Sequence, residues 1–197
     1  MKLYDLELSG NCYKVRLFCA LIGQPITLRP VNFLEGEHKS AEFIERNPFG
    51  EIPVLIDGDV ILRNSQAMLA YLARKFDRED WYPTGAREEA EVMQWLMVAE
   101  NEIARGPNDA RLHDKFAYKL DVEAARIASA RLIEILDKHL SRCKWLALSK
   151  PTIADVACFP YVALAHEGGI SLEPYTSVRA WLDRVKALPN FLTMPAI

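Results

Sequence analysis

A serine, an asparagine and a cysteine follow the first apolar run of the chain, in the stretch SGNC at residues 9–12. Apolar residues recur at helical spacing from Cys12 onward, which predicts a helix that starts directly after the strand. The N-terminus of a helix favours negative charge, including that of a thiolate. Two chemistries follow: Cys12 acts as a redox nucleophile, or the Ser9 hydroxyl donates a hydrogen bond to the sulfur of a bound thiol and favours its charged form.

A second polar cluster, RNSQA at residues 63–67, lies where a predicted hairpin passes into a helix. Ser65 lies at the start of that helix, where free N–H groups and the helix dipole suit a carboxylate; the alternative is that Ser65 only caps the helix. Pro53 opens a strand just upstream, and a proline there cannot donate to the ladder. His38 and Lys39 add two polar side chains in the loop GEHKS.

These clusters share a segment, residues 1–77, in which strand and helix patterns alternate. Strands are predicted at 2–8 and 26–33, a hairpin at 53–62, and helices at 12–22, 41–46 and 65–76. A β-α-β crossover favours parallel neighbours and a hairpin adds antiparallel ones. The order β-α-β-α-β-β-α therefore predicts a small mixed sheet.

The polar stretch 78–87 is predicted to be a linker, and strand patterns are absent beyond it. Residues 88–197 are predicted to form an all-helical domain, with helices over about 88–105, 115–141 and 174–187. Thr152 and Asp155 have the form of a capping box at the start of a further helix. This spacing assigns Asp155 a structural role.

Composition limits the function classes. The 197 residues carry a formal net charge of −3, so no global basic field is present to hold nucleic acid or an anionic membrane. No apolar run is long enough to span a bilayer, and the N-terminus does not resemble a signal peptide. The cysteines show no CxxC or zinc-ligand spacing, which predicts free thiols, no metal site and a reducing cytoplasm; three of them, Cys19, Cys143 and Cys158, are expected to be buried.

Five motifs in this order resemble the cytosolic glutathione S-transferase family over essentially the whole chain. They are SGNCYKV (9–15), GEHKSAEF (36–43), NPFGEIPVL (47–55), RNSQAMLAYLA (63–73) and TIADVACFPY (152–161). The resemblance implies a thioredoxin-like N-terminal domain (1–77) that binds glutathione as co-substrate. It also implies a helical domain that contributes the electrophile site. Ser9 matches the serine of the theta-, delta- and zeta-like branches, and a bacterial member is expected.

The resemblance also implies a role for each site residue. Ser9 would activate the glutathione thiol, with Asn11 as a second donor. Ile52 would pair its main chain with the cysteinyl unit, beside a cis Pro53, and Ser65 would hold the γ-glutamyl carboxylate. His38 and Lys39 would reach the glycyl carboxylate. Asn64 stands where the family usually has an acid for the γ-glutamyl ammonium, so charge assistance is lost there.

Alternatives stay open at this point. Cys12 falls three residues after Ser9, and packing under the helix is its favoured role over catalysis. The favoured function is transfer of an electrophile to glutathione; the alternatives are a glutathione-dependent disulfide or peroxide reductase and a non-catalytic binding protein. The wide apolar arc of the helix predicted near 88–105, together with the resemblance, predicts a homodimer.

Overall fold

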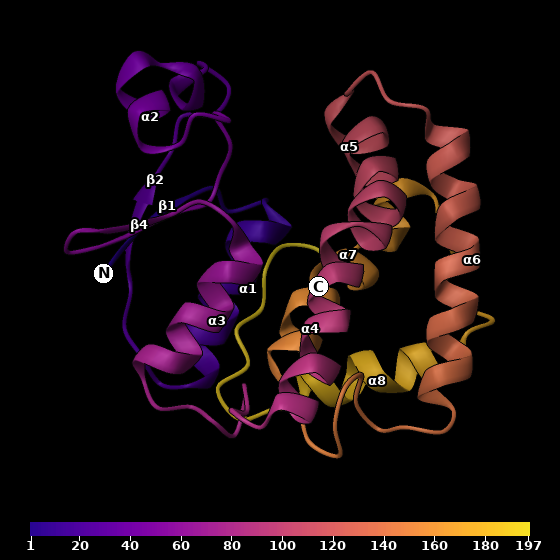
Figure 1. The fold of residues 1–197 in the computed structure, drawn as a ribbon. Helices are drawn as coiled ribbons and strands as arrows, with labels where there is room; N and C mark the ends of the chain where they lie inside the picture. The colour runs from indigo at the N-terminus through magenta and orange to yellow at the C-terminus, as the bar shows by residue number, and fades with distance from the viewer.

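The computed structural model describes all 197 residues and divides into a sheet-containing part and a helical part (Figure 1). The first part follows the predicted order of elements. Its elements are β1 (Lys2–Asp5), α1 (Gly10–Leu21), β2 (Thr27–Pro30), a short 3-10 turn (Glu37–Lys39), α2 (Ala41–Arg46), β3 (Val54–Asp57), β4 (Val60–Leu62) and α3 (Ser65–Lys75).

The four strands form one mixed sheet in the order β2-β1-β3-β4. Strand β1 runs parallel to β2, with Leu3 opposite Leu28, and antiparallel to β3, with Leu3 opposite Leu55. Strands β3 and β4 form the predicted hairpin. The mixed sheet expected from the crossover and the hairpin is therefore confirmed. The first two strands are shorter than predicted, and β1 ends at Asp5 because the residues that follow turn into the N-terminus of α1.

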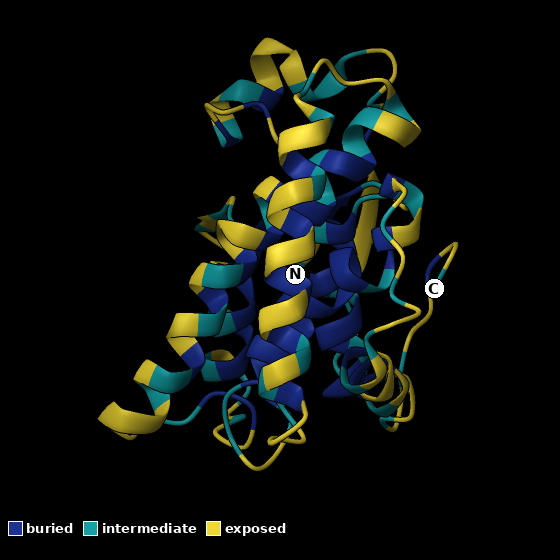
Figure 2. Ribbon diagram, turned by 90° about the vertical axis from the view of Figure 1, so that its right-hand side faces the viewer, coloured by how far each residue is buried: buried dark blue, intermediate teal, exposed yellow.

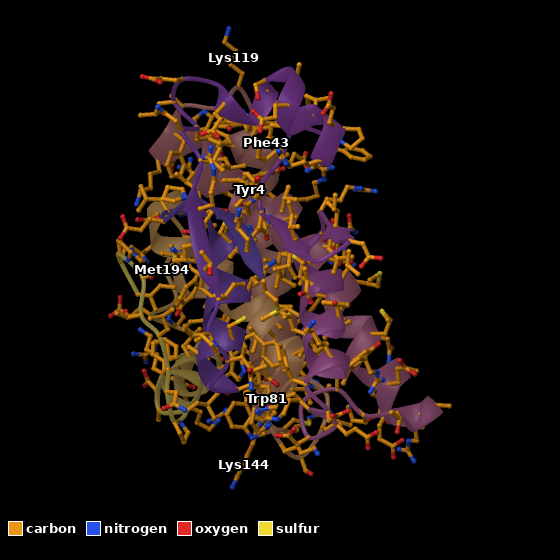
Figure 3. All side chains as sticks on the ribbon, turned by 90° about the vertical axis from the view of Figure 1, so that its left-hand side faces the viewer. Tyr4, Phe43, Trp81, Lys119, Lys144 and Met194 are labelled. Atoms are coloured by element: carbon orange, nitrogen blue, oxygen red, sulfur yellow. The ribbon has the colours of Figure 1, made fainter.

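Alternate residues of the strands point to opposite faces of the sheet, as strand geometry requires. Leu3 and Leu55 are fully buried in the core that also contains α1, α3 and the helical part of the chain. Tyr4 and Val54 point the other way and pack with Phe43 of α2. The rings of Tyr4 and Phe43 meet edge to face at 5.9 Å (Figure 3). Helix α2 thus covers one face, and α1 and α3 lie between the sheet and the helical part.

The second part is helical throughout. Its elements are α4 (Ala86–Glu100), a wider π-type turn (Ala104–Asn108), α5 (Asp109–Phe116), α6 (Val122–Leu140), α7 (Ile153–Ala163), a 3-10 turn (Ala165–Gly168) and α8 (Thr176–Lys186). The predicted all-helical class is confirmed. None of these helices, nor any other in the chain, is both long and apolar enough to cross a bilayer.

One predicted helix, over 115–141, is wrong at its start. Helix α5 ends at Phe116 because Ala117 adopts a left-handed conformation with φ of 57°. Helix α6 begins only after Asp121, whose side chain accepts a hydrogen bond from the Ala124 N–H and caps the helix. The outer face of α6 is exposed along its length, as Figure 2 shows.

The predicted capping box at the start of α7 is confirmed. Asp155 is fully buried and accepts hydrogen bonds from the main-chain N–H groups of Thr152 and Leu146, at 2.9 and 3.0 Å. The indole of Trp181 in α8 donates a further bond at 2.9 Å. Burial raises the pKa of this carboxyl, and its donors oppose that shift. Asp155 therefore joins α7, α8 and the preceding loop, which is a structural role.

Candidate functional site

Ser9 lies between β1 and α1 and is the N-cap of α1. Its backbone is extended, with φ −80° and ψ 118°, and its hydroxyl oxygen accepts a hydrogen bond from the Cys12 N–H at 3.3 Å. The residue is half-buried. A hydroxyl that accepts from the main chain still has its proton to donate. The geometry suits donation to an anionic atom that binds near the N-terminus of α1.

Cys12 is inaccessible to such a ligand. It is fully buried, and its sulfur accepts a hydrogen bond from the Leu6 N–H at 3.4 Å. Burial raises the pKa of this thiol to about 12, a shift that the Ser9 hydrogen bond opposes. A neutral, inaccessible thiol is a poor nucleophile. This environment fits packing under the helix better than redox chemistry.

All three other cysteines were predicted to be buried, but the structure buries only two of them. Cys19 and Cys158 are buried as expected, and burial raises the pKa of both thiols. Cys143 is exposed, so its predicted burial is wrong. The reason is that α6 ends at Leu140, and Cys143 lies in the loop that follows.

The N-termini of α1 and α3 meet through two polar side chains. The Ser65 hydroxyl lies 3.4 Å from the side-chain oxygen of Asn11, to which it donates. Ser65 is buried, and its hydroxyl also lies within hydrogen-bond distance of the Gln66 side-chain oxygen, so its single proton has two alternative acceptors. The structure therefore brings the two predicted clusters, 9–12 and 63–67, together at one edge of the sheet domain.

Asn64, not Ser65, caps α3. Its side-chain oxygen accepts hydrogen bonds from the main-chain N–H groups of Gln66 and Ala67, both at 3.0 Å. The alternative in which Ser65 serves only as the helix cap is therefore wrong. Ser65 is the first residue of the helix, and its hydroxyl takes no part in capping.

Glu100, at the end of α4, contributes a carboxylate that the sequence patterns did not predict. Its Oε2 accepts hydrogen bonds from Asn64 Nδ2 at 3.1 Å and from Gln66 Nε2 at 2.5 Å. Glu100 is 36 residues from Asn64 along the chain, and no local spacing links the two. The negative charge that position 64 lacks is thus supplied next to it by the helical domain.

His38 and Lys39 lie on the loop that leads to α2. The Lys39 ammonium donates to the main-chain oxygen of Gly50 at 2.8 Å and to that of Phe49 at 3.3 Å. Gly50 has φ of +59°, and a Cβ there would come within 2.9 Å of the His38 oxygen and of Lys39 Nζ, so a glycine is required. The loop is thereby fixed beside the segment that leads to Ile52.

The His38 ring stacks on Phe33, with centroids 3.8 Å apart and an interplanar angle of 6°. Its Nδ1 is buried and has no hydrogen-bond partner. Burial lowers the pKa of this imidazole, and the neighbouring Lys39 charge lowers it further. The ring is therefore predominantly neutral at pH 7.

The Ile52–Pro53 peptide bond is cis, which confirms that expectation. Pro53 is buried at the start of β3, and Ile52 is half-exposed before it. The main chain of Ile52 takes no part in the pairing of β1 with β3, which begins at Val54. This main chain is therefore suited to pair with an extended ligand.

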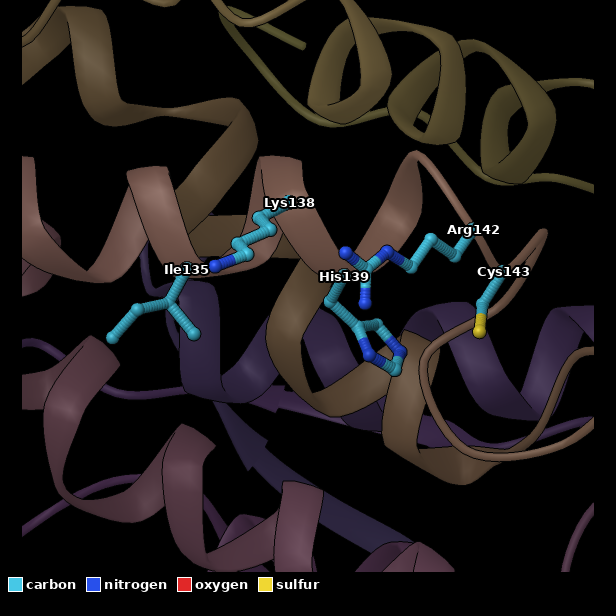
Figure 4. A pocket seen from close by; sticks show the side chains of 5 residues that line it. All are labelled: Ile135, Lys138, His139, Arg142 and Cys143. Atoms are coloured by element: carbon cyan, nitrogen blue, oxygen red, sulfur yellow. The ribbon is translucent and has the colours of Figure 1, made fainter.

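A cavity of about 390 Å³ lies elsewhere, at the C-terminal end of α6 (Figure 4). Its lining residues are Ile135, Lys138, His139, Arg142 and Cys143. None of the predicted site residues lines it. We therefore assign the candidate site to the Ser9, Asn11 and Ser65 cluster rather than to this cavity.

Two family models match the chain in sequence. Residues 3–80 match the glutathione S-transferase N-terminal domain, and residues 91–189 match the glutathione S-transferase C-terminal domain. The chain belongs to the glutathione S-transferase family. The two matches fall on the sheet-containing part and on the helical part.

Relatives extend the match over nearly the full length. Glutathione S-transferase 3 of Zea mays is 30% identical over 214 aligned positions, which cover 97% of this chain and 91% of the relative. Human glutathione S-transferase theta-2 is 34% identical, with 88% of this chain and 75% of the relative covered. A crystal structure of a glutathione S-transferase from Pseudomonas fluorescens has a TM-score of 0.92 and 30% identity, with 98% of both chains covered. Family membership supports an enzyme that transfers groups to glutathione.

Proposed function

We propose that this chain binds glutathione along the edge formed by the N-termini of α1 and α3 and activates its thiol with Ser9. The thiolate would then attack an electrophile that lies against the helical domain. The meeting of the Ser9 turn with Ser65, through the 3.4 Å contact between Ser65 and Asn11, carries this proposal. It brings the hydroxyl proposed to activate the thiol close to the hydroxyl proposed to bind a carboxylate, as a tripeptide ligand requires.

Ser9 would stabilise the thiolate without titrating itself. Its oxygen accepts from the Cys12 N–H, so its own proton is available to the glutathione sulfur. The α1 N-terminus adds a positive dipole end at the same position. Both effects favour the charged form of a thiol over the neutral form. Asn11 would be the second donor through its side-chain amide N–H₂.

The γ-glutamyl end of glutathione would bind at the start of α3. The Ser65 hydroxyl and main-chain N–H would hold its carboxylate, because the N–H groups of Gln66 and Ala67 are already bonded to the Asn64 cap. The ammonium would find the Glu100 carboxylate, which lies 3.1 Å from the Asn64 amide. Asn64 would hold this carboxylate in position and cap the helix at the same time.

The rest of the tripeptide would extend toward the α2 loop. Ile52 would pair its main chain with the cysteinyl unit beside Pro53, and His38 and Lys39 would meet the glycyl carboxylate. Lys39 is exposed, so its ammonium can reach a ligand as well as Gly50. A cation is favoured here because glutathione is an anion.

A reductase that forms a mixed disulfide on Cys12 has less support, since this thiol is fully buried and its pKa is raised to about 12.

We further propose that the chain is a serine-type member of the family and forms a homodimer in the cytoplasm. Helix α4 buries Val92, Leu96 and Ala99 within the chain and exposes Met93 and Met97 on another side. Exposed methionines of this kind suit a two-fold interface.

The test combines binding with two activities. Calorimetry with reduced glutathione is expected to give one site per chain, and an electrophile panel is expected to give conjugates without net disulfide reduction. Disulfide reduction without conjugation would instead favour the reductase. No glutathione binding would leave a non-catalytic member of the family.

A further inference from the structure

Two side chains of the helical domain hold the Ser9 turn from its two sides. Arg111 of α5 donates from Nη2 to the main-chain oxygen of Leu8 at 3.0 Å. The main-chain N–H of Asn11 donates to the hydroxyl of Tyr161 in α7 at 3.2 Å. Leu8 directly precedes Ser9 and Asn11 follows it by two residues, so these bonds fix the main chain on both sides of Ser9.

Arg111 is itself held firmly. Only 2% of it is exposed, and its Nε donates to Glu167 Oε2 at 2.5 Å. Lys115 pairs with the other oxygen of Glu167, and the ring of Phe116 lies 5.1 Å from the guanidinium. A buried guanidinium is costly unless it is paired and hydrogen-bonded. The ion pair with Glu167 therefore lets Arg111 present a fixed donor to the Leu8 oxygen.

Tyr161 contacts the turn through its ring as well as its hydroxyl. A Cβ at Gly10 would lie 2.6 Å from Cε1 of this ring, so only glycine allows the ring to pack on the first residue of α1. Tyr161 is buried, and its ring also lies 5.3 Å from the Lys14 ammonium. Direct contact with Tyr161 of α7 therefore fixes the position of the first turn of α1.

We infer that Arg111 and Tyr161 are positioning residues that orient Ser9 for thiol activation. The helical domain then serves the activation of glutathione as well as the electrophile. The inference rests on the proposed function of Ser9. Its physical basis is that a hydrogen bond to sulfur depends on direction and distance, and a turn fixed at one side only would let the hydroxyl move.

Orientation of Ser9 and binding of glutathione depend on different contacts. The proposed glutathione anchors at Ser65, Ile52 and Lys39 of the sheet domain and at Glu100 of α4 make no hydrogen bond with Arg111 or Tyr161. Loosening the Ser9 turn should therefore raise the pKa of the bound thiol and lower kcat, while the glutathione Kd and KM stay nearly constant. A merely structural role would lower the melting temperature and leave the thiol pKa of the folded protein unchanged.

The experiment compares Tyr161→Phe and Arg111→Met with two controls. Tyr71→Phe removes a tyrosine hydroxyl that donates to Asp57, and Arg184→Met removes a guanidinium that donates to the main-chain oxygen of Lys144. Tyr161→Phe keeps the ring packed on Gly10 and should therefore fold. If Arg111→Met does not fold, Tyr161→Phe alone tests the positioning role. The full-length variants are titrated with pH in the presence of saturating glutathione, and the ultraviolet absorbance of the thiolate is followed.

We expect Tyr161→Phe to lower kcat at pH 7 by roughly two- to tenfold, the range of one lost hydrogen bond. Arg111→Met should lower it by about 10- to 100-fold, the scale of a misplaced catalytic group. In both, the pKa of the bound thiol rises and the glutathione Kd stays within about twofold of the unsubstituted protein, as the lost contacts lie outside the anchors. An unchanged thiol pKa and kcat in folded Tyr161→Phe would overturn the inference. Failure of the unsubstituted protein to bind glutathione would instead overturn the proposed function, and the inference with it.

Discussion

The hydroxyl of Ser65 lies 3.4 Å from the side-chain oxygen of Asn11, so the first turns of α3 and α1 share one polar contact although 54 residues separate them. The dipole of each helix favours an anion at this end. One end faces the position proposed for a carboxylate and the other faces that proposed for a thiolate. The contact thus sets the spacing between the two charges of a bound glutathione.

Replacing Ser65 should weaken glutathione binding. We expect Ser65→Ala to cost about 1–3 kcal/mol of binding free energy, the scale of a hydrogen bond to a charged group. Calorimetry measures the loss. Ser141→Ala serves as the control, because this exposed hydroxyl donates only to the Lys138 oxygen at the end of α6. Equal affinity in Ser65→Ala and Ser141→Ala would remove Ser65 from the site.

Glu100 should contribute charge to the binding of the γ-glutamyl ammonium. Glu100→Gln is expected to weaken glutathione binding by about 1–2 kcal/mol, since a charge-assisted hydrogen bond becomes neutral. Adding Asn64→Asp should restore much of this loss, because it returns a carboxylate to the same position and keeps a good helix cap. Glu134→Gln, on the exposed face of α6, is the matched control. If the double variant binds glutathione as weakly as Glu100→Gln alone, a carboxylate at position 64 does not replace that of Glu100.

Lys14 should make stability depend on pH. It is fully buried, and burial lowers its pKa from 10.5 to about 8. The unfolded chain therefore holds this proton more tightly than the folded chain, so the free energy of unfolding should rise as pH increases from about 8 to 10.5. Lys14→Met should raise the free energy of unfolding by roughly 1–3 kcal/mol at pH 7 and lose this advantage near pH 10.5.

Urea unfolding at a series of pH values checks the Lys14 prediction. Lys186→Met, at an exposed position of α8, is the control and should follow the pH profile of the unsubstituted protein. A gain in Lys14→Met that stays constant from pH 7 to 10.5 would mean that charge burial is not its source.

The quaternary structure is predicted to be a homodimer through α3 and α4. Light scattering at micromolar concentration should give about twice the chain mass of 22.4 kDa. Met97→Glu puts a charge on the exposed side of α4 and should produce monomers, whereas Ile127→Glu on α6 should not. A monodisperse 22.4 kDa species for the unsubstituted protein would exclude the dimer.

The sequence patterns predicted correctly the features that depend on neighbouring residues, such as turns and helix caps. The Asp57-Gly58-Asp59 turn between two apolar runs indicated the hairpin, and Ser40 and Thr152 indicated helix starts through their caps. The helix predicted over 115–141 failed because its break depends on the left-handed conformation of Ala117, a residue without a turn preference of its own.

The parts of the site that the sequence could not predict come from tertiary contacts. Glu100 meets Asn64 across 36 residues, and Arg111 meets Leu8 across 103. Neither pair has a periodic spacing that a single chain could reveal. Acidic residues are also common on α4, so nothing in its composition distinguishes Glu100 from Glu88 or Glu91. Only the packing of α4 and α5 against the sheet domain selects these residues.

The pKa of the thiol of bound glutathione shows whether Ser9 activates it. Ultraviolet titration of the unsubstituted protein, Ser9→Ala and Cys12→Ala at saturating glutathione gives this value directly. We predict a pKa at least about one unit below that of a free thiol in the unsubstituted protein and in Cys12→Ala, with a return toward the free value in Ser9→Ala. A lowered pKa that survives in Ser9→Ala and disappears in Cys12→Ala would show that Cys12, and not Ser9, activates the thiol.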